Sequence, residues 1–491
     1  MRGSGQPTDT TADDRPALRI QTVDPRLYNA DLAPIEHDQR SWGWFAVFNV
    51  WSNVVQSLFM YTLAASFFVT SGLNGWAVFG AIAVAGLIIM VLVNLSGRPS
   101  IRYGVPYPVM ARASMGVRGA NVPAMCRGIV AVFWYGAQTY IASTAIALLL
   151  NSLLGIDDSR AATTLGLTPV GWIALVFVWS FQMVLFWNGI DAIRRYLNWA
   201  APMIYAVMLV LMVLLWAKAG NGLFNELGSI FQGESKTGGG VAAFMAIVGT
   251  MIASYAPIIL NYGDFTRYVG RESDMRLGNL LGLPISIALF AFMALFITAG
   301  TAVVFGERLT SPTEIIGRVD NLVLTVVAAL TFFAATVGIN LVANFVPPAN
   351  DLSNLLPSRI SFRLGGLVAA GVAFFVAAFW VTVISHLGID KFVDTLGAVL
   401  APAYGILIAD YYLVKRGRLD LQQLFSTNTD GAYFYEGGWN RKALLIFVAS
   451  AVLSVVAVWL PALDVLAGFD WLLGALIGGG GYWLSMRRPR L

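Results

Sequence analysis

The chain has few of the residues from which metalloproteins and soluble enzymes build their sites. It contains one cysteine, Cys126, which excludes an intrachain disulfide and a cysteine-based metal cluster. Its two histidines, His37 and His386, leave no histidine-rich site, so we expect neither structural zinc nor haem. Charged residues make up only 12% of the 491 residues, whereas 57% are hydrophobic. This composition lies outside the range of soluble proteins and indicates an integral membrane protein.

The net charge of the chain is small, and its charged residues are dispersed along the sequence. The net charge is +4, and the basic residues lie between apolar segments instead of forming a stripe, so we expect no nucleic-acid partner. No obligate protein partner is expected either. The first 42 residues are polar, begin with MRGS, and lack an apolar core followed by a cleavage site. We therefore predict no signal peptide and a cytoplasmic N-terminal tail over 1–42.

The apolar residues form runs that are long enough to cross a bilayer, which needs about 20 apolar residues per helix. We expect an all-α protein with twelve transmembrane helices, near 43–71, 75–97, 121–151, 169–188, 196–217, 241–262, 278–305, 321–345, 366–385, 392–413, 443–461 and 466–485. Most basic residues then fall on one side of the membrane. The other side keeps only Arg160, Lys218, Lys236, Arg308, Arg318 and Lys391. This asymmetry predicts that both termini are cytoplasmic.

Polar side chains in the first expected helix are out of place in lipid. Ser52, Asn53, Gln56 and Ser57 occur within NVWSNVVQSLF. An amide without a partner in hydrocarbon costs several kcal/mol, on the order of 2 to 7. We therefore expect these side chains to face protein, water or a ligand.

The sixth expected helix contains residues that interrupt helices. Gly249, Ser254 and Pro257 lie near its middle, and Pro257 removes a backbone donor. We expect a broken helix here, because transporters use half-helix ends at mid-membrane to bind ions and polar substrates. A proline kink without function is the alternative.

The third and eighth expected helices carry paired polar residues. Trp134 and Gln138 are four residues apart and share one helix face, as do Asn340 and Asn344. An indole beside an amide suits a flat polar ring, because the indole stacks on the ring and the amide pairs with an N–H and a C=O on its edge. For any one of these residues, a hydrogen bond between helices without a ligand is the alternative.

No expected helix carries an acidic or basic residue near its middle, which argues against a proton pump or a voltage sensor. Asp264, Asp351 and Asp410 fall at expected cytoplasmic helix ends, where we expect solvated charges or helix caps. A channel would need a filter loop or a ring of like charges, and neither occurs. An intramembrane enzyme would need a nucleophile with a base or a metal site. These exclusions favour a transporter over an enzyme.

The polar helices are the first, third, sixth and eighth, as two five-helix repeats would produce. An odd number of helices per repeat inverts the second copy across the membrane. The expected organisation is therefore a tail at 1–42, a first repeat at 43–219, a second at 241–413, a cytoplasmic loop at 414–442, two further helices at 443–485 and a tail at 486–491.

Six sequence blocks resemble the nucleobase:cation symporter-1 family, which includes permeases for allantoin, hydantoins, uracil, cytosine and purines. The blocks are YNADLAPIEHDQRSWGWFAVFNVW at 28–51, RYGVPYPVMARASMGVRGANVPA at 102–124, FWYGAQTYIAS at 133–143, NYGDFTRY at 261–268, VANFVPPANDLSNLLP at 342–357 and LAPAYGILIADYYLVKRGRLDLQQLF at 400–425. The resemblance implies a leucine-transporter-like fold, with a five-plus-five inverted repeat, two extra C-terminal helices and alternating access.

The resemblance also implies a substrate site. Trp134 matches the tryptophan that stacks on the substrate ring, Gln138 the glutamine that hydrogen-bonds it, and Asn344 the asparagine of the eighth helix. Tyr255 stands where hydantoin and allantoin members have a second stacking tryptophan. Together with Asn340, these residues form the expected site.

Two positions of the first helix depart from the family pattern. Gln56 stands where allantoin-type members have histidine, and Ser57 where they have asparagine. We include both residues in the expected substrate site, but these departures leave the identity of the substrate open.

The coupling ion implied by the resemblance is Na⁺ or H⁺, and no other cofactor is expected. The family's sodium site would fall on backbone carbonyls at Asn53 and Gln56 and on groups of the eighth helix. In the eighth helix the matching positions are Ala335, Gly338 and Ile339, with Thr336 beside them. Gly338 and Ile339 replace two hydroxyl side chains, which leaves too few hard oxygen ligands for Na⁺ unless Thr336, Ser52 or water compensates. Proton coupling or a weakened ion dependence is our hypothesis.

Taken together, the sequence predicts a secondary active transporter in a bacterial plasma membrane. It would import a small, neutral, planar heterocycle such as uracil, allantoin, a hydantoin or a purine. Two alternatives stay open: a transporter for another substrate class, such as a vitamin-like ring or an amino acid, and a substrate sensor on the same fold that does not transport.

Overall fold

The computed structural model describes residues 20–158, 160–233, 240–318, 322–384, 388–466 and 469–487. The first 19 residues of the expected N-terminal tail, the end of the C-terminal tail and His386 lie outside these residues. The described residues are helical and contain isolated β-bridges but no β-strand. The expected all-α architecture is therefore confirmed over this part of the chain.

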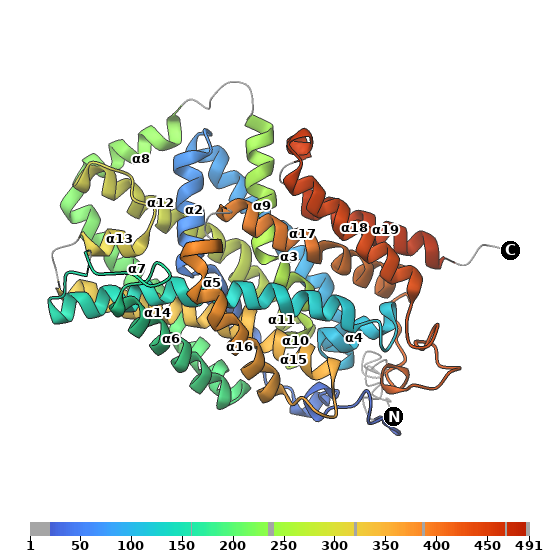
Figure 1. The fold of residues 1–491 in the computed structure, drawn as a ribbon. Coiled ribbons are helices and arrows are strands. Elements are labelled where there is room, and N and C mark those ends of the chain that lie inside the picture. Colours follow the sequence, from blue (N-terminus) through green and yellow to red (C-terminus); the bar gives the residue numbers. More distant parts are fainter. Residues whose placement is uncertain are drawn as a thin grey trace, which may run out of the picture.

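The N-terminal half of the described chain contains eight α-helices (Figure 1). They are α1 (Trp44–Val55), α2 (Leu58–Thr70), α3 (Gly75–Tyr103), α4 (Tyr107–Met115), α5 (Asn121–Leu154), α6 (Pro169–Trp187), α7 (Ile190–Ala219) and α8 (Gly222–Gln232). Two short 3₁₀ turns precede them, η1 (Ala30–Leu32) and η2 (His37–Gln39). The helices α4 and α8 lie in segments that the sequence analysis assigned to connections.

The C-terminal half continues with helices that are mostly shorter and more irregular. They are α9 (Gly240–Asn261), α10 (Gly263–Thr266), α11 (Glu272–Leu280), η3 (Leu281–Ile285), α12 (Ser286–Phe305), α13 (Pro312–Gly317), α14 (Leu322–Ile339), η4 (Asn340–Phe345), α15 (Val346–Leu355), α16 (Phe362–Ala378), η5 (Trp380–Ile384), α17 (Ile389–Ile408), η7 (Ala409–Val414), η8 (Gln423–Phe425), α18 (Arg441–Trp459), η9 (Pro461–Leu466) and α19 (Asp470–Met486). The segments η3, η4, η5 and η7 are π-helical turns within or at the end of longer helices.

Among the described residues, nine helices are long and apolar enough to span a membrane, and the bent pair α1 and α2 would make a tenth. The shorter apolar helix α16 and the helix α19 coincide with the remaining two expected spans. The chain is therefore a multi-pass membrane protein.

The break in the helices lies in the first span and not in the sixth. The axes of α1 and α2 differ by 60°, and the hydroxyl of Ser57 accepts a hydrogen bond from the amide of Met60 to begin α2. By contrast, α9 runs unbroken through Pro257, so the expected interruption of the sixth helix is wrong. A proline removes only one backbone donor, and a helix packed on neighbours tolerates that loss. Here α9 packs against both α3 and α17.

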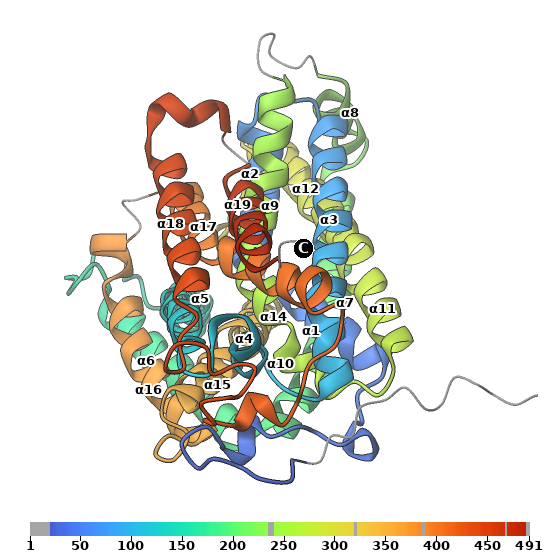
Figure 2. The same cartoon turned by 90° about the vertical axis from the view of Figure 1, so that its right-hand side faces the viewer.

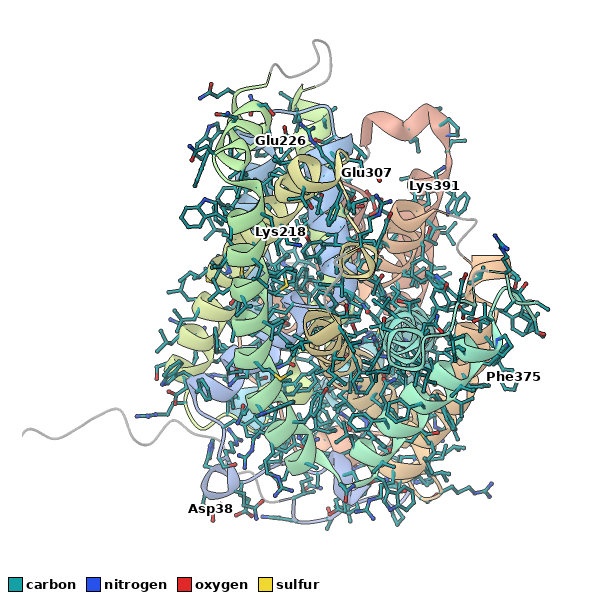
Figure 3. The ribbon with its side chains drawn as sticks, turned by 90° about the vertical axis from the view of Figure 1, so that its left-hand side faces the viewer. Asp38, Lys218, Glu226, Glu307, Phe375 and Lys391 are labelled. Atoms are coloured by element: carbon teal, nitrogen blue, oxygen red, sulfur yellow. The ribbon has the colours of Figure 1, made fainter. Side chains whose placement is uncertain are left out.

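The helix α5 occupies a central position in the molecule. It contacts α6, α14, α15 and α16, and Figure 2 shows it nearly end-on among them. The first residues of the described chain lie at one end of the molecule, close to the loop between η7 and α18. Asp38 marks that end, whereas Glu226, Glu307 and Lys391 lie toward the opposite end (Figure 3).

Candidate functional site

Trp134 lies on α5 between aromatic rings of two other helices. Its indole contacts Phe59 of α2 edge-to-face, with the ring centroids 5.0 Å apart, and Phe392 of α17 at 5.5 Å. The side chain is only 4% exposed, and its Nε1 atom has no hydrogen-bond partner among the described residues. A buried indole normally finds an acceptor for this N–H. The free N–H therefore marks a place where a ligand acceptor would be stabilised.

Gln138 lies one turn further along α5. Its side chain is fully buried, and neither its Nε2 nor its Oε1 atom has a partner among the described residues. Buried amides in proteins are almost always hydrogen-bonded, because an unpaired one costs about 1 to 3 kcal/mol. One free donor and one free acceptor on the same amide match a ligand edge that carries an adjacent C=O and N–H.

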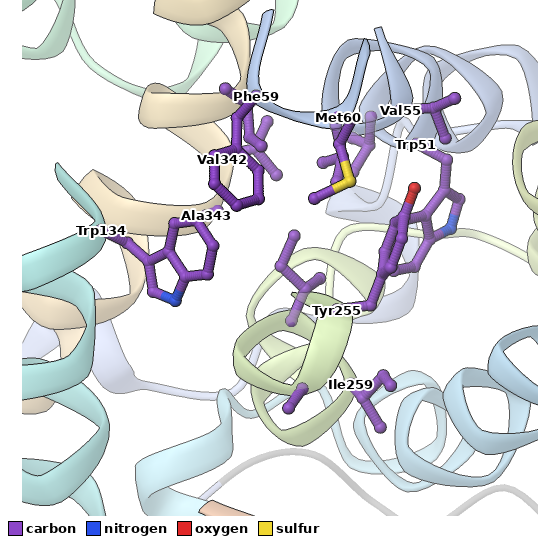
Figure 4. Packing of buried hydrophobic residues seen from close by; sticks show 14 of the residues in the cluster. Trp51, Val55, Phe59, Met60, Trp134, Tyr255, Ile259, Val342 and Ala343 are labelled. Atoms are coloured by element: carbon purple, nitrogen blue, oxygen red, sulfur yellow. The ribbon is translucent and has the colours of Figure 1, made fainter. Parts of the chain in front are cut away.

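Tyr255 comes from α9 and faces the same region. Figure 4 shows Trp134 and Tyr255 on opposite sides of the view, with Met60 of α2 between them. The Tyr255 side chain is 1% exposed. The two rings thus come from different helices and both are buried, and their role as two walls of a binding site stays a prediction.

Gln56 ends α1 at the break between α1 and α2. Both atoms of its amide are buried without a partner among the described residues. The hydroxyl of Tyr205 on α7 lies near Gln56 and Ser52 without a hydrogen bond of normal geometry. Ser57, in contrast, is occupied as the N-cap of α2. The two adjacent residues therefore differ: Gln56 is free to bind a ligand, and Ser57 holds the helix break.

Asn340 and Asn344 lie in the π-helical segment η4 and form a network with α5 and α6. The Asn340 amide donates to Gln182 Oε1 at 2.8 Å and to Thr139 Oγ1 at 3.1 Å. Its Oδ1 accepts from Asn344 Nδ2 at 2.8 Å. Protein partners thus satisfy Asn340, and this network orients Asn344 beside it. Gln182 and Thr139 are members that the sequence analysis did not include.

The residues of the expected cation site lie where α1 meets α14. Asn53 donates to the carbonyls of Asn49 and Leu197, but its buried Oδ1 has no partner among the described residues. A side chain at position 338 would overlap this Asn53 amide. The hydroxyl of Thr336 donates to the carbonyl of Phe332.

The two other positions of that expected site, Ala335 and Ile339, are buried and contribute no side-chain oxygen. Oxygen from these positions would have to come from the backbone, as the resemblance implies for Asn53 and Gln56. In the described residues no cluster of three or more histidine, cysteine or acidic side chains could hold a metal ion.

Two carboxylates expected at solvated helix ends are instead buried, and a buried arginine lies near them. Asp264 on α10 is 1% exposed, and Asp351 on α15 and Arg127 on α5 are fully buried. Asp264 accepts hydrogen bonds from the Tyr107 amide at 2.8 Å and from Asn261 Nδ2 at 3.1 Å. Burial raises the pKa of Asp264 to about 6, although these hydrogen bonds act in the opposite direction. Helix packing around α10 and α15 excludes water from these residues, although the sequence places them near helix ends.

Asp410 is also buried, which corrects the expectation of a solvated helix end. It forms an ion pair with Lys415 and accepts a hydrogen bond from the Tyr482 hydroxyl at 2.6 Å. These contacts link η7 to α19. Asp410 therefore has two protein partners, Lys415 and Tyr482, whereas the Asp351 oxygens have none among the described residues.

Arg112 on α4 is a further basic residue that the sequence placed in a cytoplasmic connection and that is fully buried. It donates to Asn354 Oδ1 at 2.6 Å and to the carbonyls of Leu27 and Leu424 at 2.9 Å. Burial lowers the pKa of Arg112 to about 9. The guanidinium ties the segment before α1 to α15 and to the loop after η7, and so closes this end of the molecule.

Comparison with known proteins agrees with this architecture. The sequence model of the family described as permease for cytosine/purines, uracil, thiamine, allantoin matches residues 34–474. The chain is 32% identical over 466 residues to the allantoin permease of Bacillus subtilis (strain 168), which covers 94% of each protein. It is 30% identical over 476 residues to the purine-uracil permease NCS1 of Arabidopsis thaliana, covering 95% of this chain and 78% of that one.

Among solved structures, the chain is similar to Mhp1, a nucleobase-cation-symport-1 family transporter, in a closed conformation with bromovinylhydantoin bound. The TM-score is 0.77 with 23% sequence identity, and the match covers 94% of this chain and 95% of that one. The two proteins therefore share a fold. The match to the family over most of the chain confirms the resemblance that the six motifs indicated. The chain belongs to the family of permeases for cytosine/purines, uracil, thiamine and allantoin, and it is a membrane transporter and not an enzyme.

Proposed function

We propose that the protein is a secondary active transporter that imports a small, neutral, planar heterocycle such as allantoin, a hydantoin, uracil or a purine. The relatives that support this class are permeases named for allantoin, for purines and uracil, and for hydantoin. The ligand would lie between Trp134 and Tyr255, with its edge against the Gln138 amide. Asn344 and Gln56 would add further polar contacts.

The single observation that carries the proposal is the fully buried Gln138 amide. Among the residues that the structure describes, neither of its polar atoms has a partner, and neither does the Nε1 atom of Trp134 one turn earlier on α5. A soluble or purely structural core satisfies such groups. Pairing both atoms with a ligand would recover about 1 to 3 kcal/mol, enough for a change in affinity of about 5- to 150-fold. A heterocycle with adjacent C=O and N–H groups supplies that complement and also presents a face to the indole.

The topology completes the proposal. Twelve spanning helices would form two inverted repeats at 43–219 and 241–413, followed by the loop at 414–442 and two helices at 443–485. The end of the molecule with Asp38 would face the cytoplasm together with both tails, 1–42 and 486–491. Relative movement of helix groups around the site would give alternating access in the plasma membrane.

Transport would be coupled to a cation. A sodium site would use the backbone carbonyls of Asn53 and Gln56 and the eighth-helix positions Ala335, Thr336, Gly338 and Ile339. The side chains at Ala335, Gly338 and Ile339 bring no oxygen, and the Thr336 hydroxyl is committed to its own helix. This donor set is poor for a hard cation, which favours a proton as the coupling ion.

A thermal-shift screen on purified protein tests the substrate class. The panel contains allantoin, hydantoins, uracil, purines, a vitamin-like ring and amino acids. We expect stabilisation by the planar heterocycles, because a ligand that binds only the folded state raises the melting temperature. Stabilisation by amino acids alone would contradict the substrate class. Counterflow of a labelled ligand in proteoliposomes then separates a transporter from a sensor that binds without transport.

A further inference from the structure

We propose that Asp351 and Asp264, together with Arg127, form the binding site for the coupling proton. This inference rests on the proposed function, since it names the ion that would drive the transport of the heterocycle. The three side chains come from α15, α10 and α5, and they meet on the cytoplasmic side of the substrate site.

Asp351 is the unusual member of this cluster. It is fully buried, and neither of its carboxylate oxygens has a hydrogen-bond partner among the described residues. It also makes no ion pair within 4.0 Å among those residues, although the charges of Asp264 and Arg127 act on it. An ionised carboxylate in such a position carries a large desolvation cost, whereas the protonated acid does not. The arrangement seen here therefore favours a proton on the Asp351 carboxyl.

Asp264 is the better hydrogen-bonded member of the pair. Its oxygens accept from the Tyr107 amide and from the Asn261 amide, and the Asn350 side chain also stabilises its charge. Two interacting carboxylates titrate as a pair, so the proton belongs to both residues. In the arrangement seen here Asp264 is suited to hold the negative charge and Asp351 the proton.

Arg127 supplies the positive charge on which both carboxylates depend. Its Nε donates to Pro257 O and to Asn261 Oδ1, each at 3.0 Å, and its Nη2 donates to Ala343 O at 2.5 Å. Its Nη1 is buried without a partner among the described residues. The Arg127 guanidinium is close enough to the Asp351 carboxylate for the two charges to interact. Both groups are fully buried, and each has polar atoms without a partner among the described residues. A small conformational change that brings Arg127 and an ionised Asp351 together would form an ion pair and stabilise both charges.

Other ionisable groups near the pair are few. Tyr107 of α4 and Cys126 of α5 are neighbours in the same cluster, and Arg267 after α10 acts on Asp264. Arg267 is already committed to the carbonyls of Asp31 and Ala33. The proton-binding capacity of this region at neutral pH therefore belongs to the two carboxylates.

The cluster is placed to transmit protonation to the substrate site. Arg127 lies two helical turns before Trp134 on α5, and its acceptor Ala343 directly precedes Asn344. Through Pro257 and Asn261 it also holds α9, the helix that carries Tyr255. Loss of the proton would leave a second negative charge beside Arg127. That charge would draw the guanidinium toward Asp351 and loosen its bonds to α9 and η4.

The proposed step is a proton equilibrium and no other bond is made or broken. A carboxylate oxygen takes up one proton while the site is accessible from outside, and releases it when the cytoplasmic side opens. One proton then moves with one neutral substrate. An inward gradient of about one pH unit would support about a tenfold accumulation of that substrate.

The test uses the full-length protein in proteoliposomes, with a labelled heterocycle that the wild type binds. We expect Asp351→Asn to bind this ligand and to perform counterflow, but to lose accumulation driven by a pH gradient. Asp264→Asn is the second variant. Asp191→Asn is the matched control, because the Asp191 side chain is 75% exposed and lies outside the cluster. A pH-sensitive dye inside the vesicles should report substrate-driven proton entry for wild type and Asp191→Asn only.

The outcomes separate this inference from the proposed function. If both carboxylate variants still accumulated substrate in response to a pH gradient, the proposed proton site would be wrong. It would also be wrong if accumulation by the wild type depended on a sodium gradient and not on pH. Absence of heterocycle binding and counterflow in the wild type would instead overturn the proposed function. A carboxylate variant that retains counterflow is folded, so its loss of coupling is not a loss of structure.

Discussion

Gly338 on α14 lies so close to the side-chain amide of Asn53 on α1 that a Cβ atom at position 338 would overlap Asn53 Oδ1. The same amide donates to Asn49 O at 2.8 Å and to Leu197 O at 3.0 Å. Asn53 therefore fixes the meeting point of α1, α7 and α14. The space that a side chain at position 338 would need is filled by the Asn53 amide.

Gly338→Ser should destabilise the protein, because the new side chain forces Asn53 out of its position. Overpacking of a buried contact costs about 1 to 3 kcal/mol. Thermal denaturation of the purified variant measures this loss, and Asn53→Ala in the same chain should restore part of it. Gly371→Ser on α16 is the control, since a Cβ atom there meets nothing within 4 Å. Equal melting temperatures for the two serine variants would contradict the close contact.

Gln138 and Gln182 provide a matched pair of buried glutamines with opposite expected effects. Gln138 has no partner among the described residues, so Gln138→Ala should lower ligand affinity by about 5- to 150-fold and leave the melting temperature unchanged or higher. Gln182 is bonded to Asn340, so Gln182→Ala should lower the melting temperature. Calorimetry for binding and thermal denaturation for stability distinguish the two roles. Unchanged affinity in Gln138→Ala would remove Gln138 from the site.

Ser57 should matter for stability more than for substrate choice. Its hydroxyl caps α2 at the break in the first span, and loss of an N-cap typically costs about 1 kcal/mol. Ser57→Ala should therefore lower the melting temperature, and Ser57→Thr, which preserves the hydroxyl acceptor without a charge, should retain more of the stability. If Ser57→Ala changed the order of substrate affinities at unchanged stability, Ser57 would belong to the substrate site.

The positions of the helices were predictable from sequence because apolar runs of membrane length have few alternatives. The expected spans at 121–151 and 169–188 differ by only a few residues from α5 and α6. The pairing of Trp134 with Gln138 on one face was equally visible, since it needs only the helical period. Local signals of this kind do not depend on the rest of the fold.

Burial at helix ends was not predictable in this way. Asp264, Asp351 and Arg127 lie beside apolar segments, where a sequence cannot show whether other helices cover them. Their burial depends on α4, α10 and α15 packing together, which is a property of the tertiary structure. The break between α1 and α2 was not predicted from the sequence either. No proline marks it, and the polar residues around it indicated a site and not a bend.

The last prediction concerns pH and follows from the burial of Asp264. Burial raises its pKa from 3.8 to about 6 in the folded protein. Between these values the folded protein holds a proton that the unfolded chain has released, so the free energy of unfolding should fall as pH rises from about 4 to about 6. The shift corresponds to at most about 3 kcal/mol. Asp264→Asn, which cannot titrate and keeps only one of the two acceptor oxygens, should reduce this slope in melting curves recorded across the range. Asp191→Asn is the control, because the Asp191 side chain is 75% exposed and lies outside the buried cluster. A slope of the opposite sign, or one unchanged in Asp264→Asn, would mean that water reaches this carboxylate in the folded protein.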